Sequence, residues 1–197
     1  QHFEREGIQT ATGCKAVRVD EGTHLVCERD SEEIRFKFDR LLIAPGRKAR
    51  TTGFGLEELG VRLGDRGLID ADGLQATNFP NIYVCGDAAG PYQFTHVAAH
   101  QAWTAAVNAL IRPFWSFQTD YRVIPWVTFT DPEVARVGLN EQEAQSRGVD
   151  FEVTRYELDD LDRAIAESEH YGFVKVLTEP LKSKIRCGTL VGSGAGE

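Results

Sequence analysis

The chain has 197 residues and a formal net charge of −8, with 42% hydrophobic and 26% charged residues. This composition is that of an ordinary folded protein, which excludes a disordered or fibrous chain and leaves room for one domain or for parts of several. The acidic balance, without a cluster of Lys and Arg, excludes a typical nucleic-acid-binding protein, and no apolar run approaches the roughly 20 residues of a membrane-spanning helix.

An antiparallel meander is predicted over residues 8–29. Its three short strands, at 8–10, 17–19 and 24–27, are separated by turn residues. The clearest turn is Asp20-Glu21-Gly22-Thr23, which precedes the return strand.

Two more strands are predicted before the glycine-rich middle of the chain. Residues 34–38 alternate between apolar and charged side chains, which is typical of a half-buried strand. Leu41 to Ala44 are four consecutive apolar residues and predict a strand that is covered on both faces. Pro45-Gly46 ends it, and a glycine turn after a buried strand is where open α/β sheets bind ligands.

Residues 51–75 are rich in glycine and predict loops. Gly53 and Gly55 have the spacing that begins a dinucleotide-binding fingerprint. Position 58 is Glu where the third glycine belongs, and no strand leads directly into the pair. We therefore expect no nucleotide phosphate site there.

A short buried strand at 82–85 is followed by Gly86-Asp87, and an Ala-rich helix then runs from Thr95-His96 to residue 111. Glycine allows the backbone to pass close to a bulky group, and the carboxylate can accept hydrogen bonds. The helix amino terminus offers N–H groups and partial positive charge. This combination suits a nucleotide cofactor, although Asp87 could instead cap its own turn.

Helical spacing also predicts which residues of this helix face the core. The apolar positions that recur at this spacing are Val97, Trp103 or Thr104, Val107, and Leu110 or Ile111.

From residue 121 the pattern changes to short strands with hairpin spacing. The predicted strands are 124–130, 134–137, 151–156, 172–177 and 189–191. One helix over 140–147 interrupts them, because Asn140 and Glu143 have the spacing of a capping box and Gly148 is a stop signal. This α+β pattern places a domain boundary near residues 113–122.

The remaining candidates for chemistry have ordinary structural interpretations. The four cysteines, at positions 14, 27, 85 and 187, are too far apart for a metal or redox pair and predict buried or half-buried thiols in a reducing cytoplasm. His170-Tyr171 is expected at the surface, and His100 in core packing. Asp159 to Asp162 is expected to be a solvated turn, because it lacks the ligand pattern of a calcium loop. Trp115 and Trp126 are expected to be packing residues.

Several of these motifs together resemble the pyridine nucleotide-disulphide oxidoreductase family. Residues 77–87, Thr-Asn-Phe-Pro-Asn-Ile-Tyr-Val-Cys-Gly-Asp, are similar to the second flavin motif of that family. Leu41 to Arg47 is similar to the strand and Gly-Arg turn that close its nicotinamide domain. Residues 124–144 and 163–175 resemble the opening of its dimerisation domain. The family motifs stand in order over nearly the whole chain, and details around 93–99 and 127–132 are more like the mercuric reductase branch than the lipoamide branch.

This resemblance implies an α/β plus α+β fold in three parts. Residues 1–50 would be the end of the NAD(P)-binding domain. Residues 51–120 would be the carboxyl-terminal half of the FAD-binding domain, and residues 121–197 the start of a truncated α+β dimerisation domain.

The resemblance also implies FAD and NAD(P)H as cofactors. Asp87, next to Gly86, would accept a hydrogen bond from a ribitol hydroxyl of FAD, and the amides at Thr95 and His96 would face the flavin ring. Gly46 would lie beside the NAD(P) site. No catalytic residue or metal ligand is assigned in this chain.

Some family features are not found in the sequence. They are the reactive Cys-x-x-x-x-Cys pair, both Gly-x-Gly-x-x-Gly fingerprints and the carboxyl-terminal His-Glu pair. Residues 48–50 also depart from the usual Pro-Asn after the Gly-Arg turn, and Cys187 stands where an aliphatic residue is usual.

We therefore expect a carboxyl-terminal fragment of an FAD-dependent NAD(P)H oxidoreductase for a small disulphide or metal ion. It would be cytoplasmic, inactive alone and homodimeric in the parent protein, with no nucleic-acid or membrane partner. The alternative is a non-catalytic dimerisation or interaction module.

Overall fold

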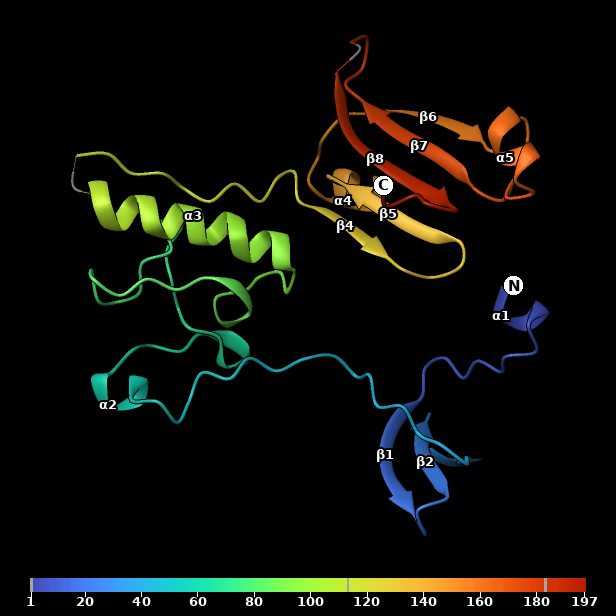
Figure 1. Cartoon of the computed structure of the whole chain (residues 1–197), viewed down its shortest axis with the longest axis horizontal. Coiled ribbons are helices and arrows are strands. Elements are labelled where there is room, and N and C mark those ends of the chain that lie inside the picture. The colour runs from blue at the N-terminus through green and yellow to red at the C-terminus, as the bar shows by residue number, and fades with distance from the viewer. Residues whose placement is uncertain (1, 113, 183) are drawn as a thin grey trace. The chain divides into compact units, whose positions relative to one another are not determined.

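The computed structural model describes residues 2–112, 114–182 and 184–197. The chain divides into two compact units, Gln1–Lys48 and Ala49–Glu197, and each is described by itself (Figure 1). Pro113, at the start of the predicted boundary region, lies outside the described residues.

The first unit is a small antiparallel sheet. Its elements are α1 (His2–Arg5), β1 (Lys15–Asp20), β2 (His24–Arg29) and β3 (Glu32–Lys37), with the strands in the order β1-β2-β3. The Thr23 N–H donates to the Asp20 carbonyl at 3.1 Å and closes the predicted turn. The meander prediction is therefore confirmed from β1 onward, but residues 8–10 form no strand.

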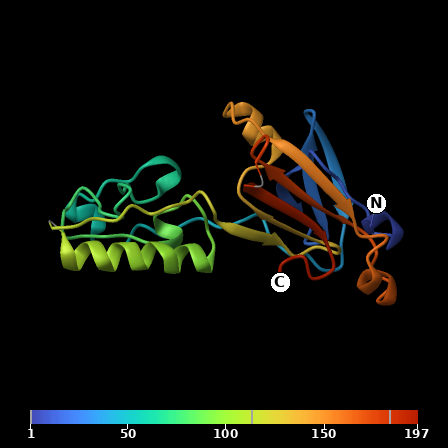
Figure 2. The same ribbon diagram turned by 90° about the horizontal axis from the view of Figure 1, so that it is seen from above.

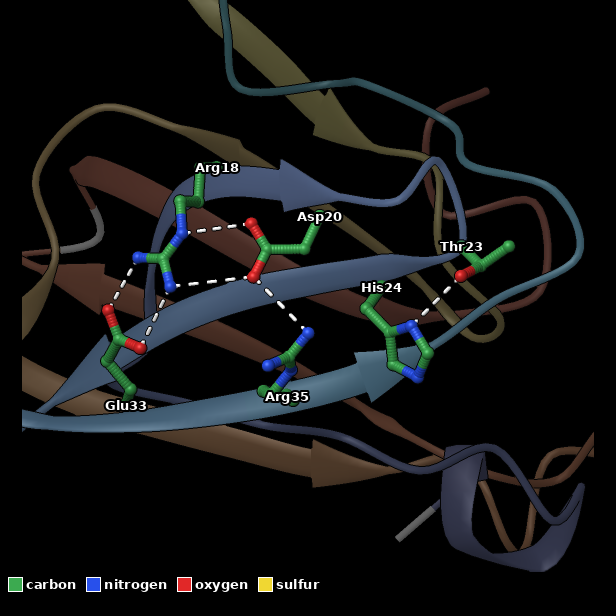
Figure 3. Close-up of polar contacts among 6 residues, drawn as sticks. All are labelled: Arg18, Asp20, Thr23, His24, Glu33 and Arg35. Carbon is green, nitrogen blue, oxygen red and sulfur yellow. Dashed lines mark hydrogen bonds and ion pairs between the residues drawn. The ribbon is translucent and has the colours of Figure 1, made fainter.

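One face of this sheet carries an ion-pair network that reaches across β2 (Figure 3). Arg18 contacts Glu33 at 2.5 Å and Asp20 at 3.0 Å, and Arg35 contacts Asp20 at 3.3 Å. Val26 is the register partner of both arginines and is fully buried. Because Arg18, Glu33 and Arg35 are exposed and only Asp20 is half-buried, their pairing contributes little to stability, and burial of Val26 matters more.

The predicted buried strand over residues 41–44 is wrong for this structure. The segment pairs with no other strand among the described residues, and Leu42 and Ile43 are 90% and 75% exposed. A strand of this type needs a hydrogen-bonded neighbour on each side and layers on both faces. The described residues of the first unit provide neither, so all four residues of the apolar run are exposed.

The second unit combines a loop-and-helix part with a five-stranded sheet. In chain order, its elements are α2 (Leu56–Leu59), η1 (Asp65–Gly67), η2 (Gly86–Ala88), α3 (Thr95–Ile111), β4 (Pro125–Thr128), β5 (Glu133–Val137), α4 (Glu141–Ser146), β6 (Glu152–Glu157), α5 (Asp162–Ala166), β7 (Phe173–Thr178) and β8 (Ile185–Gly192).

The long helix α3 forms where it was predicted, and each position predicted from helical spacing has a buried or half-buried residue among its alternatives. Val97 and Thr104 are buried, as expected. Trp103 and Leu110 are exposed, whereas the polar residues Gln101 and Asn108 are fully buried. Apolar spacing did not identify these two residues because the buried amides have backbone partners in the loops that pack on the helix.

Those loops lie along α3 and have little regular structure of their own. The segment after α3 runs back beside the helix in both views (Figures 1 and 2), and Asn108 accepts from the Phe117 N–H at 2.8 Å. The predicted strand at 82–85 is reduced to an isolated bridge between Ala76 and Tyr83. Val84 still belongs to a small apolar core.

The sheet of the second unit has the strand order β4-β5-β8-β7-β6, and every neighbouring pair is antiparallel. Ala144 of α4 packs on Leu177 and Cys187, so α4 covers the core of the sheet. This confirms the predicted antiparallel sheet with its flanking helix. The additional helix α5 was not predicted, because it is five residues long and Leu161 at its N-cap makes no side-chain capping bond.

The capping box of α4 yields a stability prediction. Asn140 Oδ1 accepts from the Glu143 N–H at 2.7 Å, and Glu143 Oε2 accepts from the Asn140 N–H at 3.0 Å. We expect Asn140→Ala to lower the free energy of unfolding by about 1 kcal/mol, because the Glu143 N–H loses its side-chain acceptor. Chemical denaturation measures this loss. Asn140→Asp keeps the acceptor and is the control; an equal loss in both variants would contradict the capping explanation.

Candidate functional site

The candidate site is centred on the turn at Gly86-Asp87. Gly86 is buried and has a φ of +73°, a conformation that favours glycine. A Cβ at this position would lie 3.3 Å from Cβ of Ala98 on α3, so the turn passes close to the helix. Asp87 follows in η2 and is half-buried. Gly86 therefore sets the path of the backbone that carries the Asp87 carboxylate.

A buried side chain of α3 holds both ends of this turn. Gln101 has no exposed surface. Its Oε1 accepts from the Gly86 N–H at 2.6 Å, and its Nε2 donates to the Gly90 carbonyl at 2.5 Å. The turn that carries Asp87 is thus tied to the helix by one amide.

The same amide reaches the segment that leads into β4. Gln101 Nε2 donates to the Tyr121 hydroxyl at 2.8 Å, and Gln75 Nε2 donates to the same hydroxyl at 3.0 Å. Sequence reasoning missed Gln75, Gln101 and Tyr121. The available signal was the spacing of Gln101, Thr104 and Asn108, three polar residues on one side of a helix without Asp, Glu, Lys or Arg.

The amino terminus of α3 begins eight residues after Asp87. Thr95 and His96 are both exposed, and the N-cap residue Phe94 makes no side-chain capping bond. The rings of Phe94 and His96 stack with centroids 5.3 Å apart. The first-turn amides of a 17-residue helix therefore lack a side-chain cap and carry partial positive charge.

Gly46 belongs to the first unit, whereas the other four predicted site residues belong to the second. It is exposed, has a φ of +99°, and a Cβ there would meet nothing within 4 Å. Its conformation fits the predicted turn after residue 44.

The second unit contains a polar cavity that was not predicted from the sequence. It lies between the loop that precedes α3 and the five-stranded sheet. Its volume is about 140 Å³, and its lining includes Phe94, Trp126, Arg136 and Glu143. The Arg136 guanidinium lies over the Trp126 ring, 5.0 Å from its centroid, and forms an ion pair with Glu143. That pairing, with the Asn140 amide, lowers the pKa of Glu143. The arginine charge is therefore largely compensated.

Several other expectations can be compared with the structure. All four cysteines are free thiols, but Cys85 is exposed, contrary to prediction. Its strand is reduced to a bridge, so no layer covers it. Trp115 is 73% exposed and is not a packing residue, whereas Trp126 contacts Phe94 edge to face at 6.1 Å. His170 and Tyr171 are exposed, as expected.

The described residues form no metal-binding site of His, Cys, Asp and Glu side chains. Those residues contain no group of three or more His, Cys, Asp or Glu side chains placed to hold a metal ion. In the predicted turn at residues 159–162, Asp160 accepts a hydrogen bond from the Tyr156 hydroxyl, which raises the pKa of Tyr156.

Among the described helices, none has the length and apolar character needed to cross a membrane.

Two protein-family models match the chain. The model described as pyridine nucleotide-disulphide oxidoreductase matches residues 1–102. The model described as the dimerisation domain of the pyridine nucleotide-disulphide oxidoreductases matches residues 124–197.

Curated relatives match almost the full chain. A dihydrolipoyl dehydrogenase of Chlamydia muridarum is 33% identical over 196 residues, which is 98% of this chain and 41% of the relative. A mercuric reductase of Streptomyces lividans is 34% identical over 198 residues, or 99% of this chain and 41% of the relative. The chain thus spans about two fifths of the length of these relatives.

Solved structures also match nearly all of this chain and a little over two fifths of their own length. LpdA from Mycobacterium tuberculosis has a TM-score of 0.88 at 25% identity, and the match covers 100% of this chain and 42% of that one. The HOCl-induced flavoprotein disulphide reductase RclA from Escherichia coli has a TM-score of 0.81 at 22% identity over 98% of this chain and 44% of that one, which shows a shared fold.

Proposed function

The chain belongs to the pyridine nucleotide-disulphide oxidoreductase family, and from this premise we propose that it is the carboxyl-terminal part of an FAD-dependent oxidoreductase that uses NAD(P)H. The observation that carries the proposal is the turn at Gly86-Asp87. It presents a half-buried carboxylate beside a long helix whose first turn has no side-chain cap.

The residues of this turn fit part of an FAD molecule. Sugar hydroxyls need a fixed acceptor, and Asp87 is a carboxylate on a backbone that Gln101 holds at both ends. The electron-rich edge of a flavin ring suits uncapped helix amides, which Thr95 and His96 provide. Gly86 allows the turn to approach α3 at a distance that a larger residue would not.

FAD, when bound, supplies the redox chemistry between NAD(P)H and the final acceptor. The residues of this chain bind and orient it. Asp87 accepts a hydrogen bond from a ribitol hydroxyl, and the amides at Thr95-His96 favour negative charge at the facing edge of the ring. Gly46, in the first unit, would lie beside the nicotinamide nucleotide.

In this proposal, each of three parts of the chain has a separate role. Residues 1–50 contribute to the NAD(P)-binding domain, residues 51–120 to the FAD-binding domain, and residues 121–197 to subunit pairing. The dimerisation-domain match over residues 124–197 supports a homodimer as the functional form.

The proposed substrate of the complete protein is a small disulphide or a metal ion. The support is that curated relatives of similar identity include both a dihydrolipoyl dehydrogenase and a mercuric reductase. Among residues 1–197, no two cysteines have the spacing of a redox pair, so substrate chemistry would use residues outside this chain.

Turnover by the chain alone is the direct test of this assignment. We expect the isolated chain to show no NAD(P)H-dependent reduction of lipoamide, glutathione disulphide or mercuric ion, because it has no Cys-x-x-x-x-Cys pair. The complete protein that contains it should be yellow and should oxidise NAD(P)H with one of these acceptors. Steady turnover by the isolated chain would contradict the proposal that substrate chemistry uses residues outside this chain. A complete protein without flavin would instead favour a non-catalytic dimerisation module.

A further inference from the structure

We propose that Gln101 is a positioning residue for the flavin site, acting through the turn that carries Asp87. This inference rests on the proposed function, because it assigns Gln101 a role in holding FAD. It adds a residue of α3 that does not itself contact the cofactor. Its side chain instead binds the backbone of Gly86, the first residue of η2, and of Gly90, two residues after the end of η2.

The hydrogen bonds of Gln101 leave no freedom in its orientation. Its oxygen accepts from the Gly86 N–H, and the two N–H groups of its amide donate to the Gly90 carbonyl and the Tyr121 hydroxyl. A flipped amide would place N–H groups against an N–H donor and oxygen against a carbonyl. Since the side chain is completely buried, water cannot replace a lost partner. The turn is therefore held in one conformation.

This restraint matters because the other contacts of the turn lead away from α3: the Ala88 carbonyl accepts from the Ile69 N–H at 2.8 Å, and Ala88 packs on the small apolar core that contains Ile69. The residues before it form only an isolated bridge, and Gly86 needs a left-handed backbone. The Ala89 and Gly90 amides bond locally to the Gly86 carbonyl, at 3.0 and 3.2 Å. These local bonds shape the turn, but Gln101 ties it to α3, whose amino terminus faces the same proposed cofactor. Gln101 thus contributes to the relative position of Asp87 and the helix terminus.

Asn108 provides a matched comparison on the same helix. It is also completely buried and also uses its whole amide. Its oxygen accepts from the Phe117 N–H, and its Nδ2 donates to the carbonyls of Leu74 and Phe117. Asn108 therefore ties loops to α3 with the same chemistry as Gln101, but none of these bonds reaches the Gly86–Gly90 turn.

The experiment compares Gln101→Leu and Asn108→Leu in the complete FAD-loaded protein. Both variants leave backbone groups without partners, so both should lower the melting temperature. We expect Gln101→Leu also to raise the dissociation constant of FAD on the order of tenfold and to shift the visible absorption band of the bound flavin. Asn108→Leu should keep the FAD affinity and the spectrum of the original protein. The readouts are FAD fluorescence on release and the flavin absorption spectrum.

Gln101→Glu covers the case in which the leucine variant does not fold. It keeps an oxygen for the Gly86 N–H and loses the two amide donors, so its FAD affinity should fall between those of the original protein and Gln101→Leu. The inference is overturned if Gln101→Glu and any folded Gln101→Leu bind FAD as tightly as the original protein, or if Asn108→Leu loses FAD equally. If Asp87→Ala also leaves FAD binding unchanged, the proposed flavin site itself is wrong. If only the Gln101 variants leave it unchanged, the site stands without this positioning role.

Discussion

Replacing Asp87 with Ala in the complete protein is expected to weaken FAD binding by about tenfold to hundredfold. A carboxylate that accepts a hydrogen bond from a cofactor hydroxyl forms a charge-assisted bond, worth roughly 1.5–3 kcal/mol. At about 1.4 kcal/mol per factor of ten, this energy corresponds to the stated range. Flavin dissociation, followed through the fluorescence of free FAD, gives the measurement.

Two controls separate this effect from general damage. Asp87→Asn keeps the size and one acceptor oxygen but removes the charge, so its loss should be intermediate. His100→Ala changes a half-buried residue of α3 whose Nε2 has no hydrogen-bond partner among the described residues, and it should affect stability more than FAD affinity. Tight FAD binding by Asp87→Ala would return Asp87 to the simpler role of capping its own turn.

Replacing Gly172 with Ala is expected to have the largest effect on stability. Gly172 precedes β7 and has a φ of +126°, a region that is nearly exclusive to glycine. A Cβ there would lie 1.8 Å from the carbonyl oxygen of Val191 in β8. That oxygen belongs to the backbone of a paired strand, so the overlap can be relieved only by separating β7 from β8. We expect a loss on the order of 3 kcal/mol or more, a large part of the 5–15 kcal/mol that stabilises a typical domain.

Gly148→Ala is the matched control for this prediction. Gly148 also has a positive φ, +63°, but a Cβ there would meet nothing within 4 Å. Only the backbone strain remains, which costs about 1–2 kcal/mol. Urea denaturation of both variants, with size-exclusion chromatography to follow subunit pairing, tests the difference. Equal losses would show that strain alone, without the contact to Val191, determines the effect of Gly172.

The parts of the fold that local signals determine were predicted well from the sequence. The capping box at Asn140 and Glu143 involves residues three apart, and it defines α4 as expected. The extent of α3 follows from its Ala-rich composition. The hairpin spacing after residue 121 gave the antiparallel sheet, because each strand pairs with neighbours that lie within the chain.

The wrong predictions share a dependence on partners distant in sequence. Leu41 to Ala44 has the composition of a central strand, but no neighbouring strand is among the described residues. The burial of Gln101 and Asn108 on α3 was missed, because their hydrogen-bond partners lie in loops 9 to 34 residues away. Apolar periodicity does not detect such bonds. The binding roles of Gly86, Asp87, Thr95 and His96 stay predictions.

The way that α3 holds its loops has a consequence for how this region opens. Loops usually fluctuate independently, because each depends on few contacts. Here the segments around Leu74, Gly86 and Phe117 are fastened to one helix by two buried amides. Releasing the segment at Leu74 or at Phe117 leaves the Asn108 amide with unpaired groups, which weakens its hold on the other segment. The Leu74 and Phe117 segments are therefore expected to open together, by slow, collective exposure of their backbone amides, whereas the turn at Gly86 depends on the separate amide of Gln101.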